Sequence, residues 1–156
     1  MNPDEIAPAP ADFFIIYTES DRRWAEWIAW CLEEAGYSVI LQAWDFRPGN
    51  NFVLMMNMAV RAHRTVAVLS PAFLEAAFVQ PEWAAALRQD PTGMGRKIIP
   101  VRVKDCQPEK SLLAQIVYID LIKCPRDAAR SILLAGVHEG RAKPQHEPPF
   151  PGISAR

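Results

Sequence analysis

Residues 65–73 read TVAVLSPAF, an apolar run rich in β-branched residues that passes directly into Ser-Pro. β-branched residues favour strands, and serine followed by proline is a favoured start for a helix. We therefore expect a strand over residues 65–69 and a helical segment from Pro71 to about residue 89. A strand that leads straight into a helix is the first half of the unit from which parallel sheets are built.

The same alternation continues on both sides of this stretch. Apolar runs predict further strands, and apolar residues spaced by three and four predict the helices between them. Pro100 has no N–H to donate, which either places its strand at or near an edge of the sheet or makes the strand irregular. Strands that alternate with helices over short connections form a parallel sheet with helices on both faces. The expected strands cover residues 12–17, 37–42, 65–69, 97–103 and 115–120, and the other helices cover 20–36, 51–60 and 125–137.

Local signals refine the expected helices. Ser20 is a suitable N-cap for the first helix, where Asp21 would complement the helix dipole. Trp30 lies away from the apolar centre of that helix, so we expect its ring to be partly exposed and to suit a partner. The run over residues 52–60 is apolar almost all round, which predicts a helix that is buried or covers a partner. In the last helix we expect three side chains to point inward, those of Ile132, Leu133 and Val137.

Composition limits the classes of function. The chain has 156 residues, half of them apolar, which suits one compact domain. Its formal net charge of -1 gives no excess of positive charge to attract nucleic acid. No apolar stretch approaches the roughly 20 residues that span a bilayer. Three cysteines without C-x-x-C spacing indicate a reduced, cytoplasmic protein, and three dispersed histidines fit no metal-ligand spacing.

The two ends of the chain differ from its middle. Residues 1–10 form an N-terminal extension without the basic start and apolar run of a signal peptide. Residues 139–156 are rich in proline and have no apolar period, which predicts an extended linker that leads to a further domain in a longer protein. The domain itself is expected over residues 11–138.

A lone carboxylate follows the Ser-Pro pair by twelve residues. Pro81 suits the first position of a helix, which puts Glu82 in its first turn. The helix dipole favours the ionised form of a carboxylate there by roughly 0.3–1 kcal/mol. From the residues alone, Glu82 is either an ordinary helix-capping acid or an ionised group held ready for chemistry.

Three motifs in this order resemble a TIR domain of the bacterial type. They are DFFIIY at residues 12–17, DFRPG at 45–49, and LSPAF at 69–73 continuing to Glu82. The resemblance implies a flavodoxin-like, three-layer fold with a five-stranded parallel sheet. It also implies one of two activities: cleavage of the nicotinamide–ribose bond of NAD+, or recruitment of other TIR domains without catalysis.

For the enzymatic members, the resemblance assigns the essential carboxylate to Glu82. Many such members carry a tryptophan four residues before the glutamate, where this chain has Phe78, with Trp83 directly after the glutamate. Ionised carboxylates stabilise the positive charge that develops on the ribose as nicotinamide leaves. NAD+ would be the substrate, with no further cofactor, because the chain has no G-x-G-x-x-G motif for holding a dinucleotide.

Residues at the carboxyl ends of the expected strands are candidates for binding that substrate, because open parallel sheets bind ligands at this edge. Tyr17 and Trp44 have rings that can stack on a base, and Thr18 and Ser70 have hydroxyls for ribose or phosphate. Each also has a purely structural interpretation: Tyr17 ends a core strand, Ser70 caps a helix and Trp44 anchors a loop. Phe78 is the remaining candidate wall of the pocket.

The Pro-Gly loop is the expected interface. Six or so residues, including aromatic ones, are more apolar than a plain connection needs, and the family uses this loop in TIR–TIR contacts. We expect Phe46 and Arg47 to be exposed anchors of the kind that interfaces favour. Self-association is expected through five residues: Asp45, Phe46, Arg47, Pro48 and Gly49.

Four functions follow as alternatives. The first is an NAD+ glycohydrolase, activated by self-assembly, that acts as an effector in bacterial antiphage defence and releases nicotinamide with ADP-ribose or a cyclic variant. The second is a non-enzymatic TIR adaptor. A phosphate-accepting receiver domain would need an aspartate where Ser70 ends the third strand. An enzyme like the nucleoside deoxyribosyltransferases would also use a glutamate, but the Pro-Gly loop and the Ser-Pro motif disfavour it.

Overall fold

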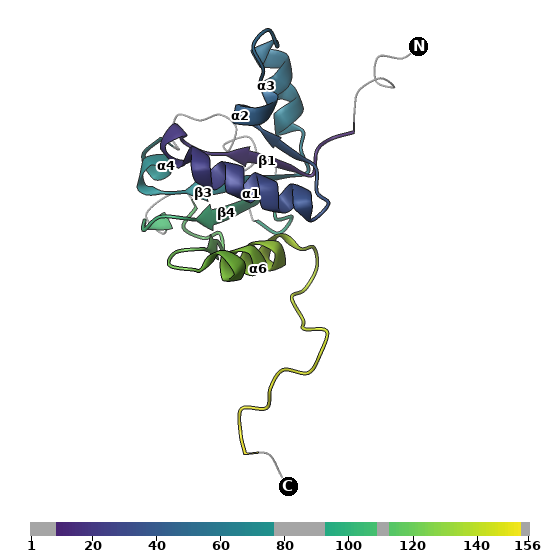
Figure 1. The fold of residues 1–156 in the computed structure, drawn as a ribbon, viewed down its shortest axis with the longest axis vertical. Coiled ribbons are helices and arrows are strands. Elements are labelled where there is room, and N and C mark those ends of the chain that lie inside the picture. The colour runs from purple at the N-terminus through teal and green to yellow at the C-terminus, as the bar shows by residue number, and fades with distance from the viewer. Residues whose placement is uncertain (1–8, 77–92, 109–112, 154–156) are drawn as a thin grey trace.

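The computed structural model of the chain describes residues 9–76, 93–108 and 113–153. Within them a parallel five-stranded sheet has the strand order β2-β1-β3-β4-β5. Helices lie on both faces of this sheet (Figure 1), which confirms the predicted α/β, flavodoxin-like architecture. The elements are β1 (Phe13–Ile16), η2 (Glu19–Asp21), α1 (Arg22–Glu34), β2 (Val39–Leu41), α2 (Gln42–Asp45), α3 (Phe52–Val60), β3 (Arg64–Leu69), α4 (Pro71–Ala76), β4 (Ile98–Arg102), β5 (Ile119–Asp120) and α6 (Arg126–Val137).

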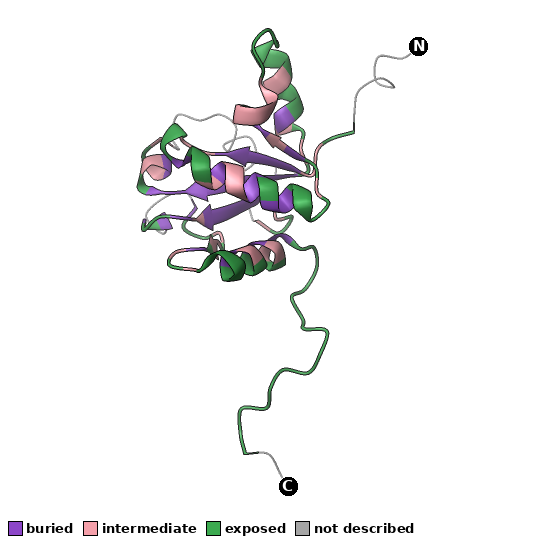
Figure 2. Cartoon of the chain, viewed as in Figure 1, coloured by how far each residue is buried: buried purple, intermediate pink, exposed green. Residues whose placement is uncertain are grey.

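Alternation along the strands divides the core into two layers. Phe13 and Ile15 of β1 belong to a cluster with α1 and α6, whereas Phe14 and Ile16 belong to a cluster with α4 and the end of α3. Successive side chains of a strand point to opposite faces, so a strand between two helix layers must be apolar at every position. Figure 2 shows the strands as the buried centre of the molecule. β3 is buried along its whole length, as its sequence predicts.

The start of the first helix differs from the prediction. Residues 19–21 form a short 3-10 turn before α1 begins at Arg22, and Ser20 does not cap the helix. The Ser20 hydroxyl lies instead 3.2 Å from that of Thr18. Asp21 points into the protein and is 1% exposed. Gly36 ends the helix as expected, since its φ of 97° is one that glycine adopts readily.

The region after β2 is more structured than the predicted loop. A single helical turn, α2, begins directly at Gln42, before the Pro-Gly turn. The Asn51 side chain accepts a hydrogen bond from the N–H of Leu54 and caps α3. Ala59 is the buried residue of α3, and most of this helix is exposed or partly exposed (Figure 2). Of the two predictions for this helix, burial is therefore wrong, and a covering role remains.

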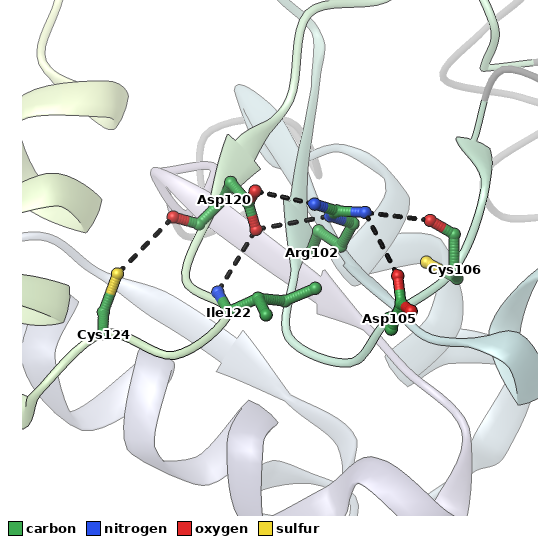
Figure 3. Close-up of polar contacts among 6 residues, drawn as sticks. All are labelled: Arg102, Asp105, Cys106, Asp120, Ile122 and Cys124. Atoms are coloured by element: carbon green, nitrogen blue, oxygen red, sulfur yellow. Dashed lines mark hydrogen bonds and ion pairs between the residues drawn. The ribbon is translucent and has the colours of Figure 1, made fainter.

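The opposite edge of the sheet is formed by β5. This strand has two residues instead of the six predicted, and it pairs with β4 at Val101 and Arg102 only. Pro100 precedes this pairing, so its missing N–H is tolerated one strand from the edge, as predicted. The Arg102 guanidinium holds Asp120 of β5 at 2.8 Å and also donates to the carbonyl of Cys106 (Figure 3). The Arg102–Asp120 ion pair thus adds to the short backbone pairing between β4 and β5.

The last helix, α6, packs against α1 on one face of the sheet. Leu133 and Val137 are buried as predicted, but Ile132 is 40% exposed, because the inward stripe passes through Ala129 instead. Trp30 of α1 is half exposed, as predicted, with the Arg130 guanidinium 5.6 Å from its ring centre. Beyond α6, residues 139–153 form neither helix nor strand and lead away from the domain (Figure 1). No described helix is long and apolar enough to cross a membrane.

Candidate functional site

A cleft of about 500 Å³ opens at the carboxyl ends of β1 and β2. Tyr17 and Thr18, both predicted as substrate-binding residues, line it from the β1 side. Arg22 from the first turn of α1 supplies a cation, paired with Glu26 at 2.7 Å and Glu19 at 3.6 Å. The cleft therefore offers two aromatic rings, those of Tyr17 and Phe46, with one threonine hydroxyl, one guanidinium and the carboxylate of Glu19. Gln42 and Ala43 complete the lining.

Tyr17 joins the two strand ends that frame the cleft. Its hydroxyl accepts a hydrogen bond of 3.2 Å from the N–H of Ala43, in the first turn of α2. Burial raises the pKa of the Tyr17 hydroxyl, while the bond from Ala43 opposes that shift. The hydroxyl stays protonated at neutral pH and keeps a proton to donate towards an oxygen in the cleft.

Behind the cleft, a buried carboxylate collects donors from three strand ends. Asp21 Oδ2 accepts from the hydroxyl of Thr18 at 2.8 Å, just after β1, and from that of Ser70, just after β3. Asp21 Oδ1 lies 2.6 Å from the ammonium of Lys104, after β4. Because Thr18 also lines the cleft, this cluster is continuous with it. It lies where the strand order reverses between β1 and β3, the usual ligand position in such folds.

The donors keep Asp21 ionised. Burial alone raises the pKa of its carboxyl, but bonds from Lys104, Ser70 and Thr18 outweigh burial and hold that pKa below the usual value of 3.8. Sequence reasoning missed this residue, because an aspartate near a helix start is normally a capping residue. The available signal was the Thr18-x-x-Asp21 spacing directly after a buried strand, with a hydroxyl at the end of β3 and a lysine after β4.

Ser70 and Trp44 have contacts of the kind their structural interpretations require. The Ser70 hydroxyl oxygen accepts a bond of 3.1 Å from the N–H of Phe73 and so caps α4, while it donates to Asp21. Trp44 packs against the core cluster of α1 and α6. Neither side chain lines the cleft formed by the described residues. Their binding of substrate remains a prediction.

The predicted interface loop is fixed at its start and exposed at its tip. Asp45 Oδ2 accepts a bond of 2.7 Å from the N–H of Leu41. Phe46 is half-buried, not exposed as expected, because its ring packs edge-on against Phe52 at 5.6 Å and lines the cleft. Arg47, Pro48 and Gly49 are exposed. The loop thus connects the cleft with the exposed face of α3.

Two predicted site residues, Phe78 and Glu82, lie outside the described residues. Their roles rest on the sequence. Among the described residues, no group of three histidine, cysteine, aspartate or glutamate side chains is arranged to hold a metal ion.

Solved structures with similar folds were found for most of the chain. The TIR domain of the Toll-related receptor TRR-2 of Hydra magnipapillata is 28% identical, with a TM-score of 0.57 over 81% of this chain and 94% of that one. A metazoan TIR-STING receptor from C. gigas, solved in complex with 2′,3′-cGAMP, is 21% identical with a TM-score of 0.66 over 85% of this chain. A second TIR-STING structure from C. gigas is 19% identical, with a TM-score of 0.62 over 85% of this chain.

The matches cover 42% and 43% of the two TIR-STING chains, so this chain spans less than half the length of those receptors. A comparison with curated protein sequences gives no significant match. The family model described as the TIR domain matches residues 13–134, from the first residue of β1 into the last helix. The motifs, the five-stranded sheet and this match agree, and the chain belongs to the TIR domain family.

Proposed function

We propose that this chain is an NAD+ glycohydrolase that acts when assembled with other copies, as an effector in bacterial antiphage defence. The supporting observation is the cleft at the carboxyl ends of β1 and β2, beside the reversal of strand order. Its volume of about 500 Å³ lies within the roughly 300–1,000 Å³ typical of small-molecule sites. Tyr17 is suited to stack on a base, and Arg22 and Thr18 to bind phosphate or ribose oxygens.

The proposed reaction breaks the bond between the ribose anomeric carbon and the nicotinamide nitrogen. The bonding electrons leave with nicotinamide, and the ribose passes through a cationic state that an ionised carboxylate stabilises. We assign this carboxylate to Glu82 from the sequence motif. Attack by water on the anomeric carbon, with loss of one proton, gives ADP-ribose, and attack by the adenine of the same molecule gives a cyclic product.

Replacing the Glu82 carboxylate by an amide tests the catalytic assignment. We expect Glu82→Gln to reduce nicotinamide release from NAD+ by at least about 100-fold, since the stabilising charge is lost. Glu75→Gln is the matched control. Glu75 is an exposed glutamate of α4, and its substitution changes the net charge by the same amount as Glu82→Gln. Chromatography of NAD+ and nicotinamide, under crowding that favours assembly, gives the rates. Equal rates for wild type and Glu82→Gln would refute the assignment.

Self-association has support from two apolar surfaces on opposite edges of the sheet. On the β2 side, the exposed fractions of Phe52, Val53 and Leu54 on α3 are 56%, 64% and 61%. On the β5 side, a cleft of about 490 Å³ is lined mainly by apolar residues, including Ile116, Val117 and Ile119. We refer to these as the α3 knob and the β5 cleft. Complementary surfaces on different edges of one subunit produce head-to-tail chains.

A non-enzymatic adaptor is the second candidate, favoured by the same exposed face of α3. Apolar patches of this kind mark protein contacts in adaptors and assembled enzymes alike. The nicotinamide assay separates the two functions, because an adaptor would assemble without consuming NAD+. We further propose that residues 139–156 lead to another domain, since the TIR-STING receptors show a TIR domain as less than half of a longer chain.

A further inference from the structure

A further cavity, of about 350 Å³, lies between the beginnings of α1 and α6. Its lining shares no residue with the cleft beside Tyr17. The two cavities border the same first turn of α1, because Arg22 lines the cleft and its neighbour Arg23 lines this cavity. We call it the α1–α6 groove, and its lining residues are Arg23, Trp24, Trp27, Cys124, Arg126 and Ala129.

Two tryptophans give the groove an aromatic wall. Trp24 and Trp27 pack edge to face, with ring centres 6.0 Å apart and planes at 88°. Both are only partly buried, so each leaves ring surface available. Across from them, Ala129 is a small residue on the buried side of α6. Stacking of a base on an aromatic side chain is worth about 1–3 kcal/mol, so this wall is suited to a flat ring.

The charged residues of the groove are all positive. Arg23 and Arg126 are both exposed, and no carboxylate belongs to the lining. Arg126 Nε lies 3.7 Å from Oδ1 of Asp127, which is outside the lining. Because the two side chains are 85% and 94% exposed, this ion pair is weak. The groove also faces the positive ends of two helix dipoles, because α1 and α6 both begin there. Guanidinium groups bind phosphate through paired N–H donors.

We propose that the α1–α6 groove binds an aromatic anion of about the size of a nucleoside monophosphate. The ring lies against Trp24 and Trp27, and the phosphate lies between Arg23 and Arg126. The cavity volume is near the lower end of the roughly 300–1,000 Å³ of small-molecule sites, which suits one ring system with one phosphate. This site is independent of the proposed hydrolysis of NAD+, because it uses none of the residues assigned to that reaction.

Cys124 allows a direct measurement of occupancy. Its thiol is free, is partly exposed, lines the groove and lies 3.9 Å from the carbonyl of Asp120 (Figure 3). The other two cysteines, Cys31 and Cys106, are buried, so they serve as slow internal references. The rate of alkylation of Cys124 by iodoacetamide, followed by peptide mass spectrometry, is measured on the full chain with AMP, adenosine or inorganic phosphate. We expect AMP to slow the reaction at Cys124 in a saturable manner, and adenosine and phosphate to act at least about tenfold more weakly.

Paired arginine variants identify the groove as the binding site. Arg126→Gln should weaken the protection by AMP about tenfold, the loss expected for a hydrogen bond to a charged group. Arg130→Gln, one helical turn further along α6 and beneath Trp30, is the charge-matched control and should leave protection unchanged. Protection is expressed as the ratio of rates with and without AMP in each variant, which cancels changes in thiol reactivity. The proposal is overturned if AMP gives no protection, if phosphate alone protects equally well, or if both variants respond alike.

Discussion

At the scale of single residues, Asp21 connects more of the fold than any predicted site residue among those described. Its carboxylate is held by groups that follow β1, β3 and β4, and it is also the residue before α1. Breaking such a buried cluster at one member leaves the other groups short of a partner. Three strand ends at the carboxyl edge of the sheet, where the cleft opens, are therefore tied together by a charge that does not line the cleft itself.

We expect Asp21→Asn to lower the free energy of unfolding at pH 7 by roughly 1.5–3 kcal/mol, the worth of hydrogen bonds to a charged group. The folded-state pKa of Asp21 lies below its usual value of 3.8. Its stabilisation is therefore fully present above that value and is lost as the pH falls through the lower, folded-state pKa. The difference between wild type and Asp21→Asn should shrink below about pH 4, which urea unfolding at a series of pH values will measure.

Lys104→Met is the informative partner variant. Removing the ammonium 2.6 Å from Asp21 raises the folded-state pKa of that carboxyl towards its usual value, so the stability lost on acidification from pH 7 to about pH 3 should be smaller than in wild type. A wild-type advantage over Asp21→Asn that stays constant down to about pH 3 would contradict the role given to the Asp21 charge.

At the scale of elements, α6 approaches β5 through a glycine. A Cβ built on Gly136 would lie 2.6 Å from Cγ1 of Ile119 and even closer to its Cδ1. We expect Gly136→Ala to destabilise the protein by about 1–3 kcal/mol through overpacking, despite the better helix propensity of alanine. In an Ile119→Ala background the clashing atoms are absent, and the same substitution should be neutral or stabilising by up to about 1 kcal/mol. Equal effects in both backgrounds, measured by chemical denaturation, would show that the Ile119 contact is irrelevant.

The elements that were predicted well are those buried on both sides. Phe13 to Ile16 and Arg64 to Leu69 form continuous buried runs, and burial on two faces leaves a sequence signal that needs no knowledge of neighbours. β5 left a weaker signal, since it pairs at two residues only and depends on the Arg102–Asp120 ion pair. Long-range partners of this kind are not visible in local sequence.

The candidate site was predicted in part for the same reason. Tyr17 and Thr18 follow a recognisable strand, so their position at the carboxyl edge could be inferred from the sequence. Asp21 could not, because its role depends on Ser70 and Lys104, which are 49 and 83 positions away in the chain. Phe46 was expected at the surface, but Phe52 of α3 packs against it.

At the scale of the whole molecule, the two apolar surfaces lie on different edges of the sheet. The α3 knob lies on the β2 side and the β5 cleft at the other end of the strand order. Symmetric dimers join the same patch twice, whereas a knob and a cleft on separate edges join heterologously and can continue without closing. The geometry of assembly can therefore be tested with two variants, each of which has only one surface disabled.

Leu54→Asp disables the α3 knob, and Val117→Asp disables the β5 cleft, since the two side chains are 61% and 90% exposed. We expect wild type to form species of increasing mass by light scattering at rising concentration, and each variant alone to remain monomeric. An equimolar mixture should stop at dimers, because a knob from one variant fits a cleft from the other and both ends are then blocked. Ile153→Asp, at a residue 97% exposed beyond α6, is the control for added charge and should assemble as wild type does. Dimers formed by Val117→Asp alone would instead show that copies join symmetrically through α3.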